Sequence, residues 1–141
     1  MKLPRAPKIR DCMDTQFDTL SPETPILEAI PFVVDRRVTG APVCDGDGRL
    51  VGILTEKDCL KLISSGTDEG LRPEGTVADF MTREIRTLAP DMDIHYAAGR
   101  FLQVEFRRYM VVDEEGRLMG ALTRLDLLKV IKRMMEETPL D

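Results

Sequence analysis

Two segments of this 141-residue sequence carry the same pattern of groups that can hold a phosphorylated sugar. The pattern is Gly-x-x-Thr-x-x-Asp, and its members are Gly52, Thr55 and Asp58, and Gly120, Thr123 and Asp126. If a helix begins after each threonine, its free N–H groups and partial positive charge favour a phosphate, and the carboxylate can accept two hydrogen bonds from a ribose cis-diol. The same residues also form a helix cap, and an aspartate has enough acceptor lone pairs for both roles. The sequence therefore predicts two capped helix N-termini, each a candidate site.

The two patterns belong to an internal duplication. Residues 9–63 align without a gap to residues 77–131 at an offset of 68. Residues 64–76 between them are rich in glycine, serine and proline, which is typical of a linker. We therefore expect repeat 1 at residues 9–63, a linker at 64–76 and repeat 2 at 77–136. A unit of about 55 residues is near the lower limit for a core of its own, so the two are expected to pack together.

The elements that must position the candidate residues follow from the periodicity. Short strands are predicted at 17–20 and 85–88, and apolar residues at helical spacing follow from Ile26 and from Ile94. Hairpins are predicted at 41–54 and 109–122, with Gly48 and Gly116 in their turns, and final helices at 55–63 and 123–135. Pro31 is expected to kink the first helix. Each unit thus has the order β-α-β-β-α, and the fold class is α+β.

Composition excludes several functions. The net charge is -5 with both signs scattered, so no basic face is expected to bind nucleic acid. With one histidine, His95, and three cysteines that form no C-x-x-C pair, a metal site and a histidine-based catalytic triad are not expected. No apolar run is long enough to cross a membrane and the start lacks a signal peptide, so a soluble, cytoplasmic protein with no membrane insertion is expected.

The sequence resembles the CBS domain family over about residues 9–136. The resemblance rests on Val77, Asp79 and Met81 at the start of repeat 2 and on the duplicated Gly-x-x-Thr-x-x-Asp. It is similar in particular to the stand-alone CBS pair, or Bateman module, in which two tandem repeats pack as a pseudo-twofold pair. The resemblance implies regulatory binding of AMP, ADP, ATP or S-adenosylmethionine in the clefts between the repeats.

The family pattern, carried over residue by residue, implies two clefts that each combine both repeats. One cleft would use Thr19, Thr39, Gly40, Ala41 and Pro42 with Thr123 and Asp126. The other would use Thr87, Arg107, Arg108, Tyr109 and Met110 with Thr55, Lys57 and Asp58. The second cleft is the basic one, and its cations suit two or three phosphate charges. A solvated helix end is the alternative interpretation of Arg107 and Arg108.

Three functions are weighed from these observations. The leading hypothesis is a non-enzymatic module that binds an adenine-containing ligand and passes the change to a regulated protein, whose identity the sequence does not give. The alternative is a ligand-independent dimerisation or interaction module with vestigial clefts, supported by the Leu/Met-rich last helix. An enzyme acting on nucleotides has the least support, because no nucleophile with a base and no Walker-type loop is present. A homodimer is expected from the family.

Overall fold

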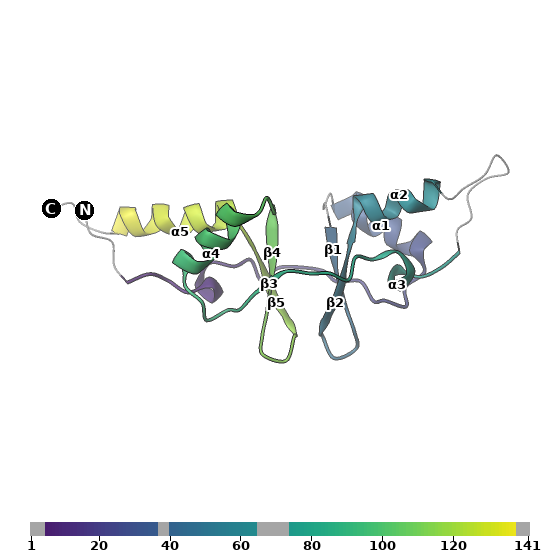
Figure 1. Ribbon diagram of the computed structural model, residues 1–141, viewed down its shortest axis with the longest axis horizontal. Coiled ribbons are helices and arrows are strands. Elements are labelled where there is room, and N and C mark those ends of the chain that lie inside the picture. The colour runs from purple at the N-terminus through teal and green to yellow at the C-terminus, as the bar shows by residue number, and fades with distance from the viewer. Residues whose placement is uncertain (1–4, 37–39, 65–73, 138–141) are drawn as a thin grey trace. The chain divides into compact units, whose positions relative to one another are not determined.

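The computed structural model describes residues 5–36, 40–64 and 74–137 (Figure 1). The chain divides into two compact units, which do not coincide with the two repeats. Unit 1 consists of the chain up to Phe17 and from Arg86 onward, and unit 2 consists of Asp18–Ile85. The segment that leads repeat 1 therefore packs with the body of repeat 2, and the segment that leads repeat 2 packs with the body of repeat 1.

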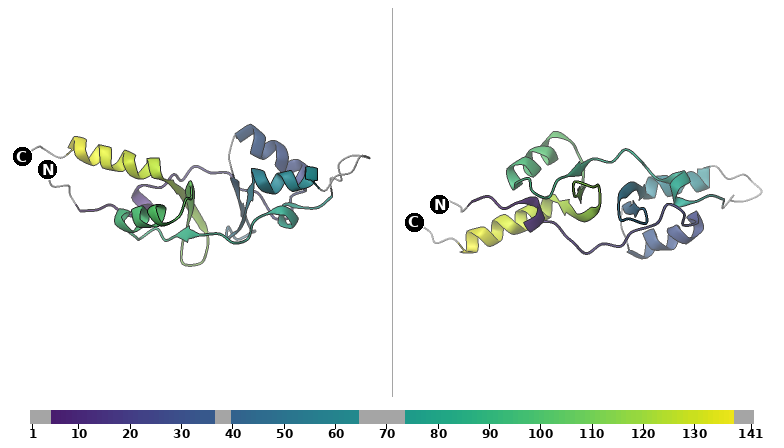
Figure 2. Two further views of the ribbon diagram at one scale, coloured as in Figure 1. Left: turned by 45° about the horizontal axis from the view of Figure 1, so that its top comes forward. Right: turned by 90° about the horizontal axis from the view of Figure 1, so that it is seen from below.

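Unit 1 is built on a three-stranded sheet with the order β3-β4-β5. Strand β3 (Thr87–Leu88) runs parallel to β4 (Arg108–Val112), which is antiparallel to β5 (Leu118–Thr123). Gly116 closes the β4-β5 hairpin with φ 83°, a left-handed conformation that glycine adopts without strain. Helices α4 (Ile94–Gln103) and α5 (Arg124–Glu137) both lie against one face of this sheet (Figures 1 and 2).

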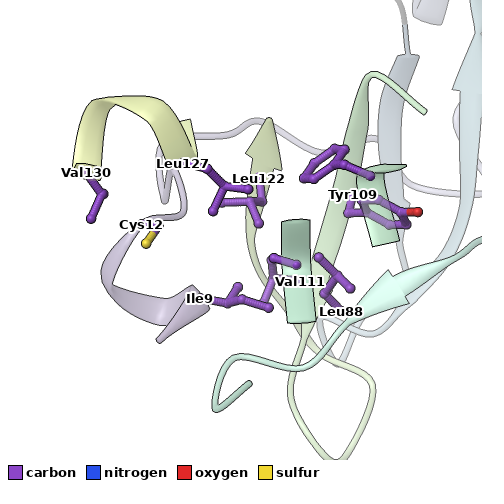
Figure 3. Packing of buried hydrophobic residues seen from close by; sticks show 10 residues of the cluster. Ile9, Cys12, Leu88, Tyr109, Val111, Leu122, Leu127 and Val130 are labelled. Atoms are coloured by element: carbon purple, nitrogen blue, oxygen red, sulfur yellow. The ribbon is translucent and has the colours of Figure 1, made fainter. Parts of the chain in front are cut away.

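The core of unit 1 includes side chains from both ends of the chain (Figure 3). A short 3-10 helix, η1 (Ile9–Asp11), is fixed by hydrogen bonds from Ile9 N to Met92 O at 2.7 Å and from Arg10 N to Pro90 O at 3.0 Å. The buried cluster consists of Ile9, Cys12, Leu88, Ala97, Phe101, Tyr109, Val111, Leu122, Leu127 and Val130. The leading segment of repeat 1 thus completes the core of unit 1.

Unit 2 repeats this plan with a smaller sheet. Strands β1 (Gly40–Cys44) and β2 (Leu50–Thr55) form an antiparallel hairpin, with Gly48 in the turn at φ 83°. Three helices share a core with this hairpin: α1 (Ile26–Arg36), α2 (Glu56–Ser64) and α3 (Val77–Phe80). The buried cluster consists of Leu20, Ile26, Ala29, Val33, Ala41, Val43, Leu54, Leu62, Val77 and Met81.

The predicted strand at 17–20 is wrong. Only Leu20 pairs with β1, by an isolated parallel bridge to Val43, whereas Thr87 and Leu88 in unit 1 form two rungs with Met110 and Val111. The position that corresponds to Met110 is Pro42, which has no N–H to donate. The rung at Thr19 is therefore lost, and one bridge is too little to make a strand.

The two hairpins and the four long helices occur as predicted, with bounds shifted by a few residues. Helix α1 continues through Pro31, and its expected kink stays a prediction. Two short helices, η1 and α3, are three and four residues long and were not expected from the periodicity. The packing of the repeats on each other and the linker at 64–76 also stay predictions. In the described parts of the chain, no helix has the length and apolar character needed to cross a bilayer.

Candidate functional site

The N-terminus of α5 carries the first candidate site, in unit 1. Thr123 ends β5, and its backbone N–H donates to Asp126 Oδ2 at 2.8 Å, while Asp126 N–H donates to Thr123 Oγ1 at 3.1 Å. This reciprocal pair is the predicted cap. Asp126 is half-buried, and among the described residues no partner is found for its Oδ1. The free oxygen is available to accept a hydrogen bond from a ligand.

Three arginines surround this N-terminus. Arg108 begins β4 and is the register partner of Thr123, and Arg107 directly precedes it. Arg107 and Arg124 are exposed and line a cavity of about 290 Å³ together with Glu105 and Phe106. These guanidinium groups present planar, permanently charged donors that match phosphate oxygens.

Arg108 is the most buried of the three arginines. Burial lowers the pKa of its guanidinium from the ordinary value, and the carboxylate of Asp14 acts in the opposite direction. Asp14 reaches this position because its backbone pairs with Ala121 of β5, with N···O distances of 2.8 and 2.9 Å. A partly desolvated cation beside the α5 N-terminus favours an anionic ligand.

The other predicted site residues of unit 1 have less side-chain surface available to a ligand. Thr87 is half-buried and pairs with Met110, whose side chain is buried. Tyr109 has no exposed surface, its hydroxyl donates to Arg100 O at 3.1 Å, and its ring stacks edge-on against Phe101 at 4.8 Å between centroids. The Tyr109 side chain is therefore part of the core, and only its backbone is placed to contact a ligand.

The N-terminus of α2 carries the second candidate site, in unit 2. The same cap is present, with Thr55 N–H donating to Asp58 Oδ2 at 2.9 Å and Asp58 N–H donating to Thr55 Oγ1 at 3.0 Å. Here, however, the carboxylate is 4% exposed and accepts further bonds from Lys61 Nζ and from the Thr82 hydroxyl. Burial by itself would raise the pKa of Asp58, but the hydrogen bonds from Thr55, Lys61 and Thr82 outweigh it, so the pKa is lowered.

The remaining predicted residues of unit 2 lie around β1. Gly40 is the register partner of Thr55, and a Cβ on it would lie 3.0 Å from Ile53 Cγ2. Ala41 and Pro42 are buried in the strand. Of the others, Lys57 is exposed in the first turn of α2, Thr19 is exposed, and Thr39 lies outside the described residues.

The registers bring the predicted residues together within each unit. Arg108 lies opposite Thr123, and Gly40 lies opposite Thr55, so each helix N-terminus adjoins the strand start of its own repeat. The sequence prediction paired each group with the other repeat. That pairing stays a prediction.

Four residues near these helix N-termini were not among the sequence candidates. They are Asp14, Lys61, Thr82 and Arg124. The alignment of the two repeats could have pointed to these residues, because at the constant offset Asp14 corresponds to Thr82 and Arg124 corresponds to Glu56. A change of charge between two matched positions marks a point where the repeats have diverged in chemistry.

A larger cavity, of about 660 Å³, lies elsewhere on unit 1, beyond β3. Its lining includes Thr87, Tyr96 and Glu114, together with Arg10 and Asp91, which pair with each other at 2.6 Å. Of the predicted site residues only Thr87 borders it.

Comparison with known proteins gives consistent results. A family model described as the CBS domain matches residues 9–65 and again residues 77–133. The A-adding tRNA nucleotidyltransferase of Aquifex aeolicus is 32% identical over 130 residues, which cover 92% of this chain and 15% of that protein. Two other curated relatives are covered over 42% and 60% of their length, so the chain spans only part of the proteins it matches.

Two solved structures with ligands are similar to this chain. The crystal structure of CBSX2 in complex with AMP, a protein of Arabidopsis thaliana, has a TM-score of 0.74 at 28% identity and covers 91% of this chain and 98% of that one. The cytosolic domain of the Mg²⁺ channel MgtE in complex with ATP has a TM-score of 0.67 at 27% identity, with coverage of 84% and 46%. The double match of the family model and the repeated hairpin-helix plan agree, and the chain belongs to the CBS domain family as a tandem pair of its repeats.

Proposed function

We propose that this chain is a regulatory module that binds an adenosine-containing ligand at the α5 N-terminus of unit 1. The ligand class is AMP, ADP, ATP or S-adenosylmethionine. The observation that carries the proposal is the Asp126 carboxylate, whose Oδ1 has no partner among the described residues and lies next to a strand start that holds Arg107 and Arg108. CBSX2 and MgtE, whose structures contain AMP and ATP, support the ligand class.

Each part of such a ligand has a matching group. Asp126 Oδ1 would accept from the ribose diol, because the other carboxylate oxygen is held by Thr123. The backbone N–H groups of the first turn of α5 and the guanidinium groups of Arg107 and Arg124 would receive the phosphates. S-adenosylmethionine lacks phosphates and would use the ribose contact alone.

The proposed role is binding without turnover. The groups at the α5 N-terminus to which we assign the ligand are threonine, aspartate and arginine, which hold and neutralise a ligand. In the described part of this group no nucleophile lies beside a general base. The ligand-bound state would then be passed to a partner protein that the chain regulates.

Thermal unfolding with and without ligand tests the proposal. At a ligand concentration of about 100 times Kd, binding stabilises the fold by about 2.7 kcal/mol, which raises Tm by roughly 5–11 °C for a chain of this size. AMP, ATP and S-adenosylmethionine are the probes, with GMP and inorganic phosphate as controls. If none of the three adenosine compounds moves Tm at millimolar concentration, the proposal fails.

A second candidate function rests on the outer face of α5. Leu125, Leu128 and Met135 are 59%, 60% and 50% exposed and recur at helical spacing. An apolar stripe of this kind on a helix is an interaction surface, and a second copy of the chain is the expected homodimer partner. Analytical ultracentrifugation of Leu128→Glu, with Glu136→Lys as the matched exposed control on the same helix, would distinguish this function. If Leu128→Glu sediments as the parent does, the stripe is not a dimer contact.

A further inference from the structure

The two aspartates of the duplicated pattern have the same cap but different surroundings. In unit 2, Asp58 Oδ1 accepts from Lys61 Nζ at 2.9 Å and from Thr82 Oγ1 at 3.1 Å, and Oδ2 accepts from Thr55 N at 2.9 Å and Thr82 Oγ1 at 3.0 Å. Its side chain is 5% exposed. In unit 1, Asp126 is half-buried and, in the described part of the chain, has only its cap partner Thr123.

A ribose diol needs free acceptor positions on the carboxylate. At Asp58 both oxygens are already occupied, so a diol would have to displace the Thr82 hydroxyl and break the Lys61 ion pair. Lys61 is held in place a second time, because its Nζ also donates to Phe80 O at 3.2 Å. At Asp126 a diol meets Oδ1 without displacing a described group.

One matched position accounts for the hydroxyl contact in this difference, whereas the lysine does not, because Lys61 and its counterpart Lys129 are identical. Thr82 pairs through its backbone with Ile53, and its counterpart Asp14 pairs in the same way with Ala121. Thr82 has a hydroxyl that donates to the carboxylate beside it, whereas the ionised Asp14 has no proton to donate. Asp14 Oδ1 instead accepts from Gln16 N at 2.9 Å. The position that closes one carboxylate therefore leaves the other open.

The charges around the two helix N-termini also favour ligand binding at α5 rather than at α2. Arg107, Arg108 and Arg124 lie at the α5 N-terminus. In repeat 1 the last two of these positions are Gly40 and Glu56. At the α2 N-terminus Lys61 is bound to Asp58, and Lys57 lies beside Glu56. The α5 N-terminus instead offers three guanidinium groups to a phosphate, beside the carboxylates of Asp14 and Glu105.

We infer that Thr82 and Lys61 hold the Asp58 carboxylate inside unit 2, so that the chain binds one adenosine ligand, through Asp126, rather than two. Thr82 is thus a positioning residue that makes Asp58 a structural group. The inference rests on the proposed function and deepens it, since it assigns ligand binding to one of two sequence-matched sites.

Native mass spectrometry and calorimetry of the full chain with AMP and with ATP test the number of ligands. We expect one bound nucleotide per chain, and Asp126→Asn is expected to weaken AMP binding at least tenfold. Arg124 is exposed, so Arg124→Gln should leave the core intact and weaken ATP binding severalfold. The matched variant in unit 2, Glu56→Gln, should leave ATP binding unchanged. These exposed variants keep the test valid if Asp126→Asn folds poorly.

The role of the hydroxyl at position 82 is tested by placing it in the other repeat. Asp14→Thr and Asp14→Val remove the same charge and have nearly the same shape, but only threonine can donate to Asp126. We expect Asp14→Thr to bind AMP at least about fivefold more weakly than Asp14→Val, as one competing hydrogen bond to the carboxylate implies. Equal affinities overturn the role given to Thr82.

The outcomes separate this inference from the function on which it rests. Two nucleotides per chain overturn the inference and leave the proposed function standing. Binding undiminished in Asp126→Asn overturns the inference and also the placement of the ligand at the α5 N-terminus, while adenosine binding by the chain still stands. The absence of binding by the parent chain overturns the proposed function itself.

Discussion

Replacement of each capping aspartate by alanine gives a direct measure of how differently the two repeats use the same residue. Asp58→Ala removes the cap bond to Thr55, worth about 1 kcal/mol, and the bond from the Thr82 hydroxyl, worth about 1 kcal/mol. It also removes the ion pair with Lys61, whose side chain is 55% exposed, so that pair is worth no more than about 0.5 kcal/mol. Together these losses destabilise the protein by roughly 2–3 kcal/mol.

Asp126→Ala is the matched control, because among the described residues it removes only the cap bond to Thr123 and costs about 1 kcal/mol. The difference between the two variants is then roughly 1–2 kcal/mol, or about 3–8 °C in Tm. Circular dichroism melts and urea titrations of protein stripped of nucleotide would measure it. If the two variants lose the same stability, Lys61 and Thr82 contribute nothing to Asp58, and the difference proposed between the units has no energetic basis.

Three further predictions concern acid stability and two glycines. Because the pKa of Asp58 is below its ordinary value of 3.8, its contribution to stability is complete above that value and is lost as the pH falls through the lower pKa of the folded state. The difference in unfolding free energy between the parent and Asp58→Asn should therefore shrink as the pH falls below the ordinary value of 3.8, and a constant difference would contradict the assignment. Gly120→Ala should cost about 1–3 kcal/mol in urea titrations, since its Cβ would lie 2.7 Å from the backbone oxygen of Asp14; an unchanged midpoint would show that this strand pairing is looser than described. Gly99→Ala should instead stabilise α4 by about 0.5–1 kcal/mol, because in the described chain no atom beyond its two neighbours and the helix's own backbone lies within 4 Å of the added Cβ, and a lower midpoint would count against that open space.

Local patterns predicted the elements well, where the constraint on the backbone is itself local. Gly48 and Gly116 end tight turns at the same φ of 83°, and the cap residues Thr55 and Thr123 begin the two last helices as expected. The strand expected at 17–20 failed for a non-local reason. Its partner position is Pro42, and the cost of the missing N–H becomes visible only once the register is known.

The state of each candidate carboxylate also depends on contacts that sequence spacing does not reveal. The sequence matched Asp58 to Asp126 correctly, yet the partner that distinguishes them, Thr82, is 24 residues from Asp58. Comparison of the repeats tells which positions are equivalent, but not which repeat a segment packs against. For the same reason the sequence does not show that the segment that leads each repeat packs with the body of the other repeat.

That exchange of leading segments has a consequence for synthesis on the ribosome. Unit 2 is continuous in the chain, so all of its residues have been synthesised once Ile85 is added. It can therefore begin to fold while the rest of the chain is still being made. Unit 1 cannot close until β5 (Leu118–Thr123) has emerged, because Asp14 must pair with Ala121. Ile9 and Cys12 complete the core of unit 1 and therefore stay exposed while unit 2 is synthesised. We expect this early segment to be the part of the nascent chain that is most exposed to chaperones and proteases.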